Sequence, residues 1–167
     1  MHAVVWCKSD SPLGALYVAS RAGRLVALSL GGDEKAFLNE IERWGAPRFS
    51  AGELGGVVRQ LEEYFAGTRT AFDVEVDLSG LSPFQQSVLQ ETLAIPYGKV
   101  KTYKELACAV GKPGAARAVG TALGNNPIAI IVPCHRVIAS DGTLGGYSSA
   151  GGIADKRRLL ALEGALA

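Results

Sequence analysis

The sequence is poor in the residues that mark secreted, zinc-binding and membrane proteins. Its 167 residues include only three cysteines, Cys7, Cys108 and Cys134, and none forms the C-x-x-C pair typical of structural zinc sites. Their odd number and wide spacing also argue against a disulfide scaffold. The chain does not open with a basic segment followed by an apolar stretch, and the apolar run at 128–132 is far too short to span a bilayer. We therefore expect reduced thiols in a cytoplasmic protein with no membrane contact.

The sequence also lacks a strong excess of charge of either sign, since its formal net charge is +1. Residues 1–81 contain 8 basic and 11 acidic side chains, whereas residues 82–167 contain 9 and 5. The basic excess of the second half favours a polyanion as partner, although an ordinary solvated surface remains the simpler explanation. With 48% hydrophobic and 20% charged residues the chain is not disordered, and it is long enough to bury a core without metal or disulfides.

The first half predicts a small antiparallel sheet followed by two helices. Residues 3–6, 15–19 and 25–30 are β-compatible runs separated by turn signals. Residues 34–44 and 54–65 repeat apolar side chains at three-to-four spacing, which is typical of amphipathic helices. No catalytic grouping occurs in this half. We place a boundary in the segment 77–83, DLSGLSP, and expect domains at residues 1–78 and 79–167.

The second half predicts a mostly helical domain. Ser82 and Pro83 are suited to begin a helix over 84–92, and Thr102-x-x-Glu105 is a capping box for a helix reaching about residue 110. A Gly/Pro turn leads to a further helix over 115–123. Two short helices joined by such a turn suggest a helix-turn-helix, although the pattern alone favours a helical hairpin that only packs. A buried strand over 128–132 and a last helix over 154–162 complete the prediction.

Cys134 is the best placed residue for nucleophilic chemistry, because it follows the predicted strand and directly precedes His135 and Arg136. A thiol with a pKa of about 8.5 is mostly protonated at neutral pH, so it needs a neighbouring base or positive charge to react. Consecutive residues of an extended segment point to opposite sides, so His135 would reach Cys134 only through a bend or a water. On these residues alone, a structural cysteine is favoured over a catalytic one, and the catalytic alternative stays open.

A glycine-rich loop at 140–152 and the end of the last helix supply further candidates. The loop could close over a ligand, with Tyr147 stacking on it, or it could be an ordinary surface loop. Glu163 ends the last helix, where a carboxylate opposes the helix dipole. This small cost suggests another partner for its charge, unless solvent alone compensates it.

The string Pro133-Cys134-His135-Arg136-Val137 resembles the active-site signature of the O6-alkylguanine-DNA alkyltransferases. Other strings similar to that family follow in the same order: IPYGKV at 95–100, TY at 102–103, AARAVG at 115–120, NP at 126–127, GYS at 146–148 and LLALEG at 159–164. The resemblance is dense over 83–164 and weak at 11–14. It implies an α/β (α+β) two-domain fold, with a small ribonuclease-H-like scaffold at 1–78 and a mostly helical winged helix-turn-helix-like domain at 79–167.

The resemblance implies DNA repair by direct reversal without a cofactor. An alkyl group would pass irreversibly, once per molecule, from O6 of guanine, and from O4 of thymine, to Cys134. His135 with a bound water would take the thiol proton, Glu163 would orient His135, and Tyr103 would donate a proton toward N3 of the departing guanine. Asn126 would hold the turn before the active-site segment. The pocket and lid residues that the motifs imply are Pro133, Val137, Gly145, Gly146, Tyr147 and Ser148.

Double-stranded DNA carrying O6-alkylguanine is the partner that the resemblance implies. O6 of a paired guanine cannot be reached inside the duplex, so the nucleotide would be flipped into the pocket, with Arg117 filling the space it leaves. The family's helix-turn-helix docks in the minor groove, so recognition would be nearly independent of sequence. We expect a monomer and leave cooperation on DNA open. The other residues expected at this interface are Thr102, Ala115, Ala116, Ala118 and Gly120.

Three features differ from the family pattern. The segment from Tyr147 to Lys156 is about two residues longer than usual, so Ser148 and Ser149 compete for the lid role. Ala129 stands where some relatives have proline, which would widen the pocket for bulkier adducts. The first half lacks the scattered Cys and His side chains that bind zinc in some relatives, so we expect no metal.

Two other classes of protein stay open. A DNA-binding regulator would use the helix-turn-helix with an inert, buried Cys134, and a Cys-His hydrolase would turn over repeatedly without needing Arg117 or Tyr103. The presence of Cys134 favours transfer, because inactive relatives of the family replace this cysteine. Cys7 and Cys108 are expected to be small, buried or half-buried hydrophobic side chains.

Overall fold

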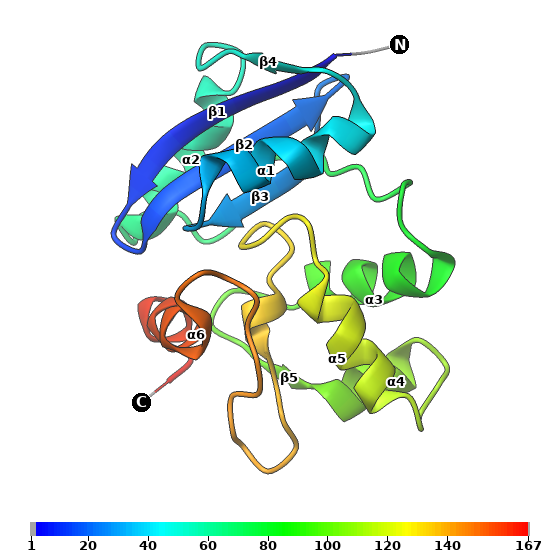
Figure 1. Ribbon diagram of the computed structural model, residues 1–167. Helices are drawn as coiled ribbons and strands as arrows, with labels where there is room; N and C mark the ends of the chain where they lie inside the picture. The colour runs from blue at the N-terminus through cyan, green and yellow to red at the C-terminus, as the bar shows by residue number, and fades with distance from the viewer. Residues whose placement is uncertain (1–2, 167) are drawn as a thin grey trace. The chain divides into compact units, whose positions relative to one another are not determined.

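The computed structural model describes residues 3–166, which form two compact units (Figure 1). The first contains the chain up to Asp77 together with Pro127–Ala129, and the second contains Leu78–Asn126 and the chain from Ile130 onward. A small sheet unit followed by a mostly helical unit confirms the predicted α/β two-domain class. Within residues 3–166, no helix combines the length and the apolar character needed to cross a membrane.

A four-stranded sheet forms the centre of the first unit. Its strands, β1 (Val4–Ser11), β2 (Gly14–Arg21), β3 (Arg24–Leu30) and β4 (Pro47–Phe49), lie in the order β3-β2-β1-β4. β2 pairs antiparallel with both β1 and β3, whereas β4 pairs in parallel with β1. The three predicted strands are confirmed with longer bounds. β4 has no sequence signal, because three residues are too few to show an alternating pattern.

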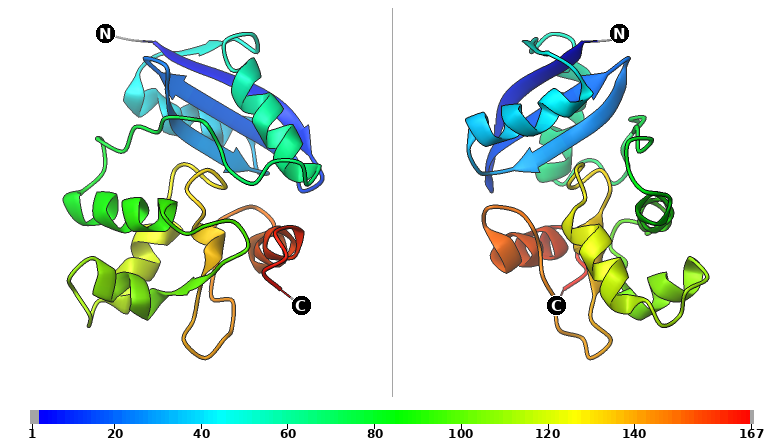
Figure 2. Two further views of the ribbon diagram at one scale, coloured as in Figure 1. Left: turned by 180° about the vertical axis from the view of Figure 1, so that it is seen from behind. Right: turned by 45° about the vertical axis from the view of Figure 1, so that its right-hand side comes forward.

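Two helices cover opposite faces of this sheet (Figure 2). They are α1 (Glu34–Ile41), which continues into the 3-10 turn η1 (Glu42–Trp44), and α2 (Gly55–Phe65), and they confirm the two helices predicted for this half. Phe37 and Ile41 of α1 are buried in a cluster with side chains of β1, β2 and β3, and the rings of Tyr17 and Phe37 stack with centroids 5.4 Å apart. Of the residues predicted to shape the site, only Ala129 lies in this unit.

The second unit is built on short capped helices. α3 (Pro83–Leu93) begins at Ser82, whose hydroxyl accepts a hydrogen bond from the Gln85 amide at 3.2 Å. α4 (Tyr103–Ala109) begins at Thr102, whose hydroxyl accepts from the Glu105 amide at 3.0 Å. α5 (Ala116–Gly124) follows a Gly/Pro turn, packs against α4 and completes a helix-turn-helix. The unit ends with α6 (Gly152–Leu162), and β5 (Lys101–Thr102) pairs in parallel with β6 (Val137–Ile138).

The strand predicted over residues 128–132 is wrong. Ile128 makes an isolated bridge to Leu28 of β3, after which the chain turns and Ile130 adopts a φ of 69°, which regular strands do not contain. Proline on both sides of the run removes backbone donors, and the Asn126 side-chain amide donates to the Val132 carbonyl at 3.0 Å, closing a loop. The apolar run therefore reflects burial rather than strand pairing.

The three cysteines are free thiols in different surroundings. Cys7 is buried in β1, as expected. The expectation for Cys108 is wrong, because α4 carries this residue on its exposed side. Cys134 is buried as well, and its surroundings form the candidate site.

Candidate active site around Cys134

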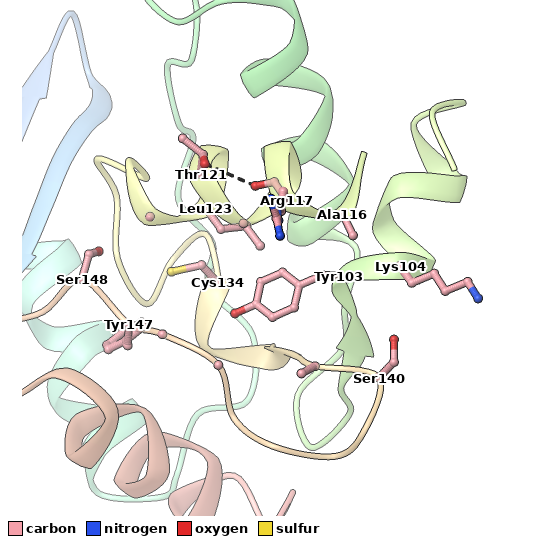
Figure 3. A pocket seen from close by; sticks show the side chains of 15 residues that line it. Tyr103, Lys104, Ala116, Arg117, Thr121, Leu123, Cys134, Ser140, Tyr147 and Ser148 are labelled. Atoms are coloured by element: carbon pink, nitrogen blue, oxygen red, sulfur yellow. Dashed lines mark hydrogen bonds between the residues drawn. The ribbon is translucent and has the colours of Figure 1, made fainter. Parts of the chain in front are cut away.

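A cavity of about 710 Å³ in the second unit is lined by Cys134, the start of α4, one side of α5 and the loop after β6 (Figure 3). Most of the residues predicted for the site are brought together here. Those that line it are Tyr103, Ala116, Arg117, Gly120, Cys134, Gly145, Gly146, Tyr147 and Ser148. The cavity therefore joins segments that lie up to 45 positions apart in the chain.

A sharp bend places Cys134 at this cavity. Pro133 has φ −80° and ψ 63°, and the Cys134 amide donates to the Val132 carbonyl at 2.8 Å, which is the geometry of an inverse γ-turn. Cys134 then begins the 3-10 turn η2 (Cys134–Arg136) rather than ending a strand. Burial raises the pKa of the thiol, while a hydrogen bond from the Asn126 side chain and the charge of Lys156 act to lower it. The resting thiol is protonated at neutral pH, so its reaction requires a base.

A buried ionic network lies next to Cys134 in the chain. His135 Nε2 is 2.7 Å from Glu163 Oε2. Arg136 donates to the same carboxylate twice, from Nε at 2.7 Å and from Nη2 at 3.0 Å, and donates from Nη1 to the Ile95 carbonyl at 2.7 Å. Sequence reasoning offered Arg136 as a positive neighbour for a thiolate. The structure instead commits it to Glu163, whose buried charge it balances.

The state of His135 follows from this network. Burial lowers the pKa of His135, and the hydrogen bond and negative charge of Glu163 only partly oppose that shift. The ring is therefore neutral at pH 7, with Nε2–H donating to Glu163 and Nδ1 left as an acceptor. Nδ1 is buried and has no hydrogen-bond partner among residues 3–166. The neighbour of the thiol thus carries an unused basic nitrogen.

Tyr103 forms part of the cavity wall near Cys134 (Figure 3). Burial raises the pKa of its hydroxyl, as does the negative charge that Cys134 would carry, so the hydroxyl remains a proton donor at neutral pH. Two glycines lie beside the ring, and only Gly145 is required to leave room for it. A Cβ at Gly120 would lie 3.9 Å from it, and a Cβ at Gly145, where φ is +72°, would lie 2.5 Å from the hydroxyl oxygen. Position 145 therefore accepts only glycine beside this tyrosine.

Lys156 is a buried part of the site that sequence reasoning missed. Its side chain is fully buried, and Nζ donates to the carbonyls of Val137 at 2.6 Å, Gly146 at 3.2 Å and Leu144, and to the Tyr103 hydroxyl at 3.4 Å. Burial lowers its pKa to about 8, although the charge of a Cys134 thiolate would raise it. One signal was available, since position 156 shares a helical face with Leu159, Leu160 and Glu163.

The loop over the cavity carries the two serines that the sequence left in competition. Ser148 lines the cavity, whereas the Ser149 hydroxyl donates to Asp155 Oδ2 at 2.6 Å. Tyr147 also lines the cavity, and burial raises the pKa of its hydroxyl well above the ordinary value. That hydroxyl has no hydrogen-bond partner within the described part of the chain. Asp155, like Lys156, was not singled out from the sequence.

The remaining predicted residues lie around the cavity rather than in its lining. Thr102 and Ala115 occupy the N-cap positions of α4 and α5, and Ala118 is exposed on α5. Pro133 and Val137 are buried on either side of η2, and the Val137 carbonyl accepts from Lys156. Ala129 does not line the cavity either. Among residues 3–166, no group of three His, Cys, Asp or Glu side chains could hold a metal ion.

Arg117 projects from the side of α5 that lines the cavity (Figure 3). Its side chain is exposed, while its carbonyl accepts a hydrogen bond from the Thr121 hydroxyl at 3.2 Å within the helix. Ala116 and Gly120 lie on the same side of α5 and also line the cavity. The cavity edge at α5 thus combines the exposed, cationic side chain of Arg117 with small residues.

Comparison with known proteins gives a consistent family assignment. The model of the 6-O-methylguanine DNA methyltransferase ribonuclease-like domain matches residues 4–78, and the model of that family's DNA binding domain matches residues 83–165. The methylated-DNA–protein-cysteine methyltransferase of Mycobacterium tuberculosis is 49% identical over 154 residues, covering 92% of this chain and 88% of the relative. That of Shigella flexneri is 49% identical over 164 residues, covering 95% of each chain.

Solved structures agree with the sequence comparison. The crystal structure of Mycobacterium tuberculosis OGT in complex with DNA superimposes with a TM-score of 0.84 at 46% identity, covering 96% of this chain and 92% of the other. The two family models together span nearly all of the sequence, including every residue of the cavity. With its cysteine-lined cavity and its match to both domains, this chain belongs to the 6-O-methylguanine DNA methyltransferase family.

Proposed function

We propose that this protein repairs DNA by moving an alkyl group from O6 of guanine, and from O4 of thymine, onto Cys134. The observation that carries the proposal is the placement of Cys134 in the lining of a 710 Å³ cavity, directly followed by the buried His135–Glu163 pair. The relatives are methylated-DNA–protein-cysteine methyltransferases, which supports the same reaction here. An inert cysteine, as in a purely DNA-binding regulator, would not need a cavity of this kind.

The proposed reaction balances as a displacement at the alkyl carbon. The Cys134 proton passes to the unpartnered Nδ1 of His135, directly or through a water, and Glu163 stabilises the charge that His135 gains. A bond forms between Sγ and the alkyl carbon as the bond from that carbon to O6 breaks. The electron pair stays with the guanine, which takes a proton at N3 from Tyr103. The thioether product has no easy way back, so each molecule acts once.

The proposed DNA contact is centred on α5. A guanine inside a duplex cannot present O6 to a buried thiol, so we infer that the nucleotide is flipped into the cavity. Arg117 is exposed at the cavity edge and is the side chain that would fill the vacated stack. Ala115, Ala116, Ala118 and Gly120 would allow α5 to approach the minor groove closely. The protein would act as a monomer, with Tyr147 and Ser148 closing over the base.

The test is the intact mass of the protein after incubation with a duplex oligonucleotide containing one O6-methylguanine, followed by peptide mapping. We expect one added methyl group per molecule, located on Cys134, and no further uptake from excess substrate. A Cys134→Ala variant should bind the duplex and take up nothing. Loss of the lesion without modification of the protein would indicate a turnover enzyme and would overturn the proposal, as would an intact lesion.

A further inference from the structure

The loop over the cavity is held on both sides by two consecutive residues of α6. Lys156 binds the carbonyls of Leu144 and Gly146, which precede Tyr147 and Ser148. Asp155 binds the part that follows, where its Oδ2 accepts from the Ser149 hydroxyl at 2.6 Å and from the Gly151 amide at 3.1 Å. Tyr147 and Ser148 therefore lie between two fixed points. We call residues 144–151 the lid segment.

The Asp155 attachment is compact and buried. Asp155 is only 6% exposed although it carries a carboxylate in the first turn of α6, and the two hydrogen bonds satisfy one of its oxygens. Gly151 has an ordinary helical conformation, with φ −85° and ψ −3°, so its backbone does not require glycine. The available space does require glycine here, because a Cβ at position 151 would collide with the Asp155 carboxylate. The Asp155 carboxylate thus occupies the space that a side chain at position 151 would need.

The same contacts separate the roles of the two serines. The Ser149 hydroxyl is engaged with Asp155, whereas Ser148 lines the cavity. We propose that Asp155 is a positioning residue: by holding Ser149 and Gly151, it fixes the lid segment so that Tyr147 and Ser148 face a flipped base. This inference rests on the proposed function only in naming a base as the ligand.

Loss of the Asp155 contacts should weaken binding of the lesion more than it slows the chemical step. Within residues 3–166, Asp155 hydrogen-bonds Ser149 and Gly151 and forms no hydrogen bond or ion pair with Cys134, His135 or Tyr103, so its loss leaves the reacting groups in place. A lid segment that is free at one end must be ordered when the base enters, and this entropy cost weakens binding. The expected signature is a higher concentration for half-maximal rate with a nearly unchanged limiting rate of transfer.

The experiment compares Asp155→Asn and Ser149→Ala with wild type in single-turnover transfer from an O6-methylguanine duplex, at a series of protein concentrations. Asp155→Asn should raise the half-saturating concentration about tenfold and change the limiting rate less than about threefold. Ser149→Ala should act in the same direction and more weakly. Asp141→Asn is the matched control, because Asp141 is an exposed acid at the start of the same loop, outside the lid segment, where its Oδ1 accepts from the Thr143 amide and hydroxyl; it should change neither quantity.

A second pair of variants distinguishes loss of the Asp155 contacts from general misfolding. Gly151→Ala should loosen the lid segment by displacing the Asp155 side chain, although Asp155 is intact and the backbone accepts alanine. In an Asp155→Ala background there is no carboxylate to displace, so adding Gly151→Ala should do no further harm. Additive losses in the double variant would show that the two residues do not act through one another and would overturn the proposal.

Hydrogen exchange of the free proteins separates this inference from the proposed function. Asp155→Asn and Gly151→Ala should speed amide exchange across residues 146–152 at least about fivefold, while exchange in α3 and α5 stays as in wild type. Unchanged exchange in the lid segment, or a uniform rise over the whole chain, would overturn the positioning role. Failure of wild-type Cys134 to accept an alkyl group would instead overturn the proposed function, and the exchange result would still decide the role of Asp155.

Discussion

Glu163 holds a buried negative charge at the carboxyl end of α6, where the helix dipole opposes it. The structure shows what compensates this cost: two hydrogen bonds from Arg136 and one contact with His135. A helix-ending carboxylate already suggested a partner from the sequence. Its identity could not follow from local pattern, because His135 lies 28 positions away and only the family motifs connect the two.

Replacing Glu163 should affect stability and reaction rate together. Glu163→Gln leaves Arg136 as a buried charge without a counter-ion, so we expect the free energy of unfolding to fall by about 3 kcal/mol, measured by urea denaturation. It also removes the charge that stabilises a protonated His135, so single-turnover transfer should slow by about 10- to 100-fold. Glu105→Gln, at an exposed position of α4, is the control. A destabilised variant with a wild-type rate would show that Glu163 only balances Arg136.

At the scale of elements, the sequence predicts those structural features that depend on residues close together in the chain. The helix starts at Ser82 and Thr102 were visible because each cap and its amide partner are three positions apart. The loop at 128–132 was not visible, because its turn depends on bonds to Leu28 and Asn126. The burial of Lys156 depends on carbonyls from three distant positions, which no local pattern identifies. Its sequence signal is limited to a helical face shared with apolar residues.

Lys156 ties the lid segment to the end of η2, and its state should make lesion binding depend on pH. Its pKa of about 8 means that it holds three donor hydrogens at pH 7 and loses one as the pH rises toward 9. With one carbonyl then unpartnered, the half-saturating concentration for an O6-methylguanine duplex should rise across this interval. Lys156→Met should bind weakly at both ends and show no such step. Lys35→Met, on the exposed side of α1, should retain the wild-type step.

An Lys156→Met variant that followed the wild-type pH profile would contradict this assignment. The limiting rate must be read separately in these measurements, because burial raises the pKa of the Cys134 thiol and more thiolate forms as the pH rises. Only the half-saturating concentration reports on the lid segment. The comparison therefore distinguishes a change in binding from a change in the nucleophile.

At the scale of the whole molecule, basic charge is concentrated in the half that carries the cavity. Residues 82–167 contain 9 basic and 5 acidic side chains, and Arg117 is exposed at the cavity edge. This modest excess fits a partner held through phosphate contacts that weaken as salt rises.

Arg117 should matter for duplex DNA and not for the chemistry itself. We expect Arg117→Ala to slow transfer from an O6-methylguanine duplex by about 10-fold or more, because in the proposed function this side chain fills the space left by a flipped nucleotide. Reaction with the free base O6-methylguanine should change less than about twofold, since no stack has to be opened. Arg59→Ala, on the exposed side of α2, is the matched loss of charge. Equal losses on both substrates would contradict the insertion role.

Pro127–Ala129 belongs to the first unit but is synthesised long after the rest of it. Leu28 donates to the Pro127 carbonyl at 2.8 Å and accepts from the Ala129 amide at 3.0 Å, so β3 gains these two hydrogen bonds only when that short segment has emerged. By then α3, α4 and α5 have been translated as well. Until residues 127–129 have emerged, the edge of the nascent sheet at β3 therefore lacks these two hydrogen bonds. Cys134 emerges only five residues after the segment that completes the sheet.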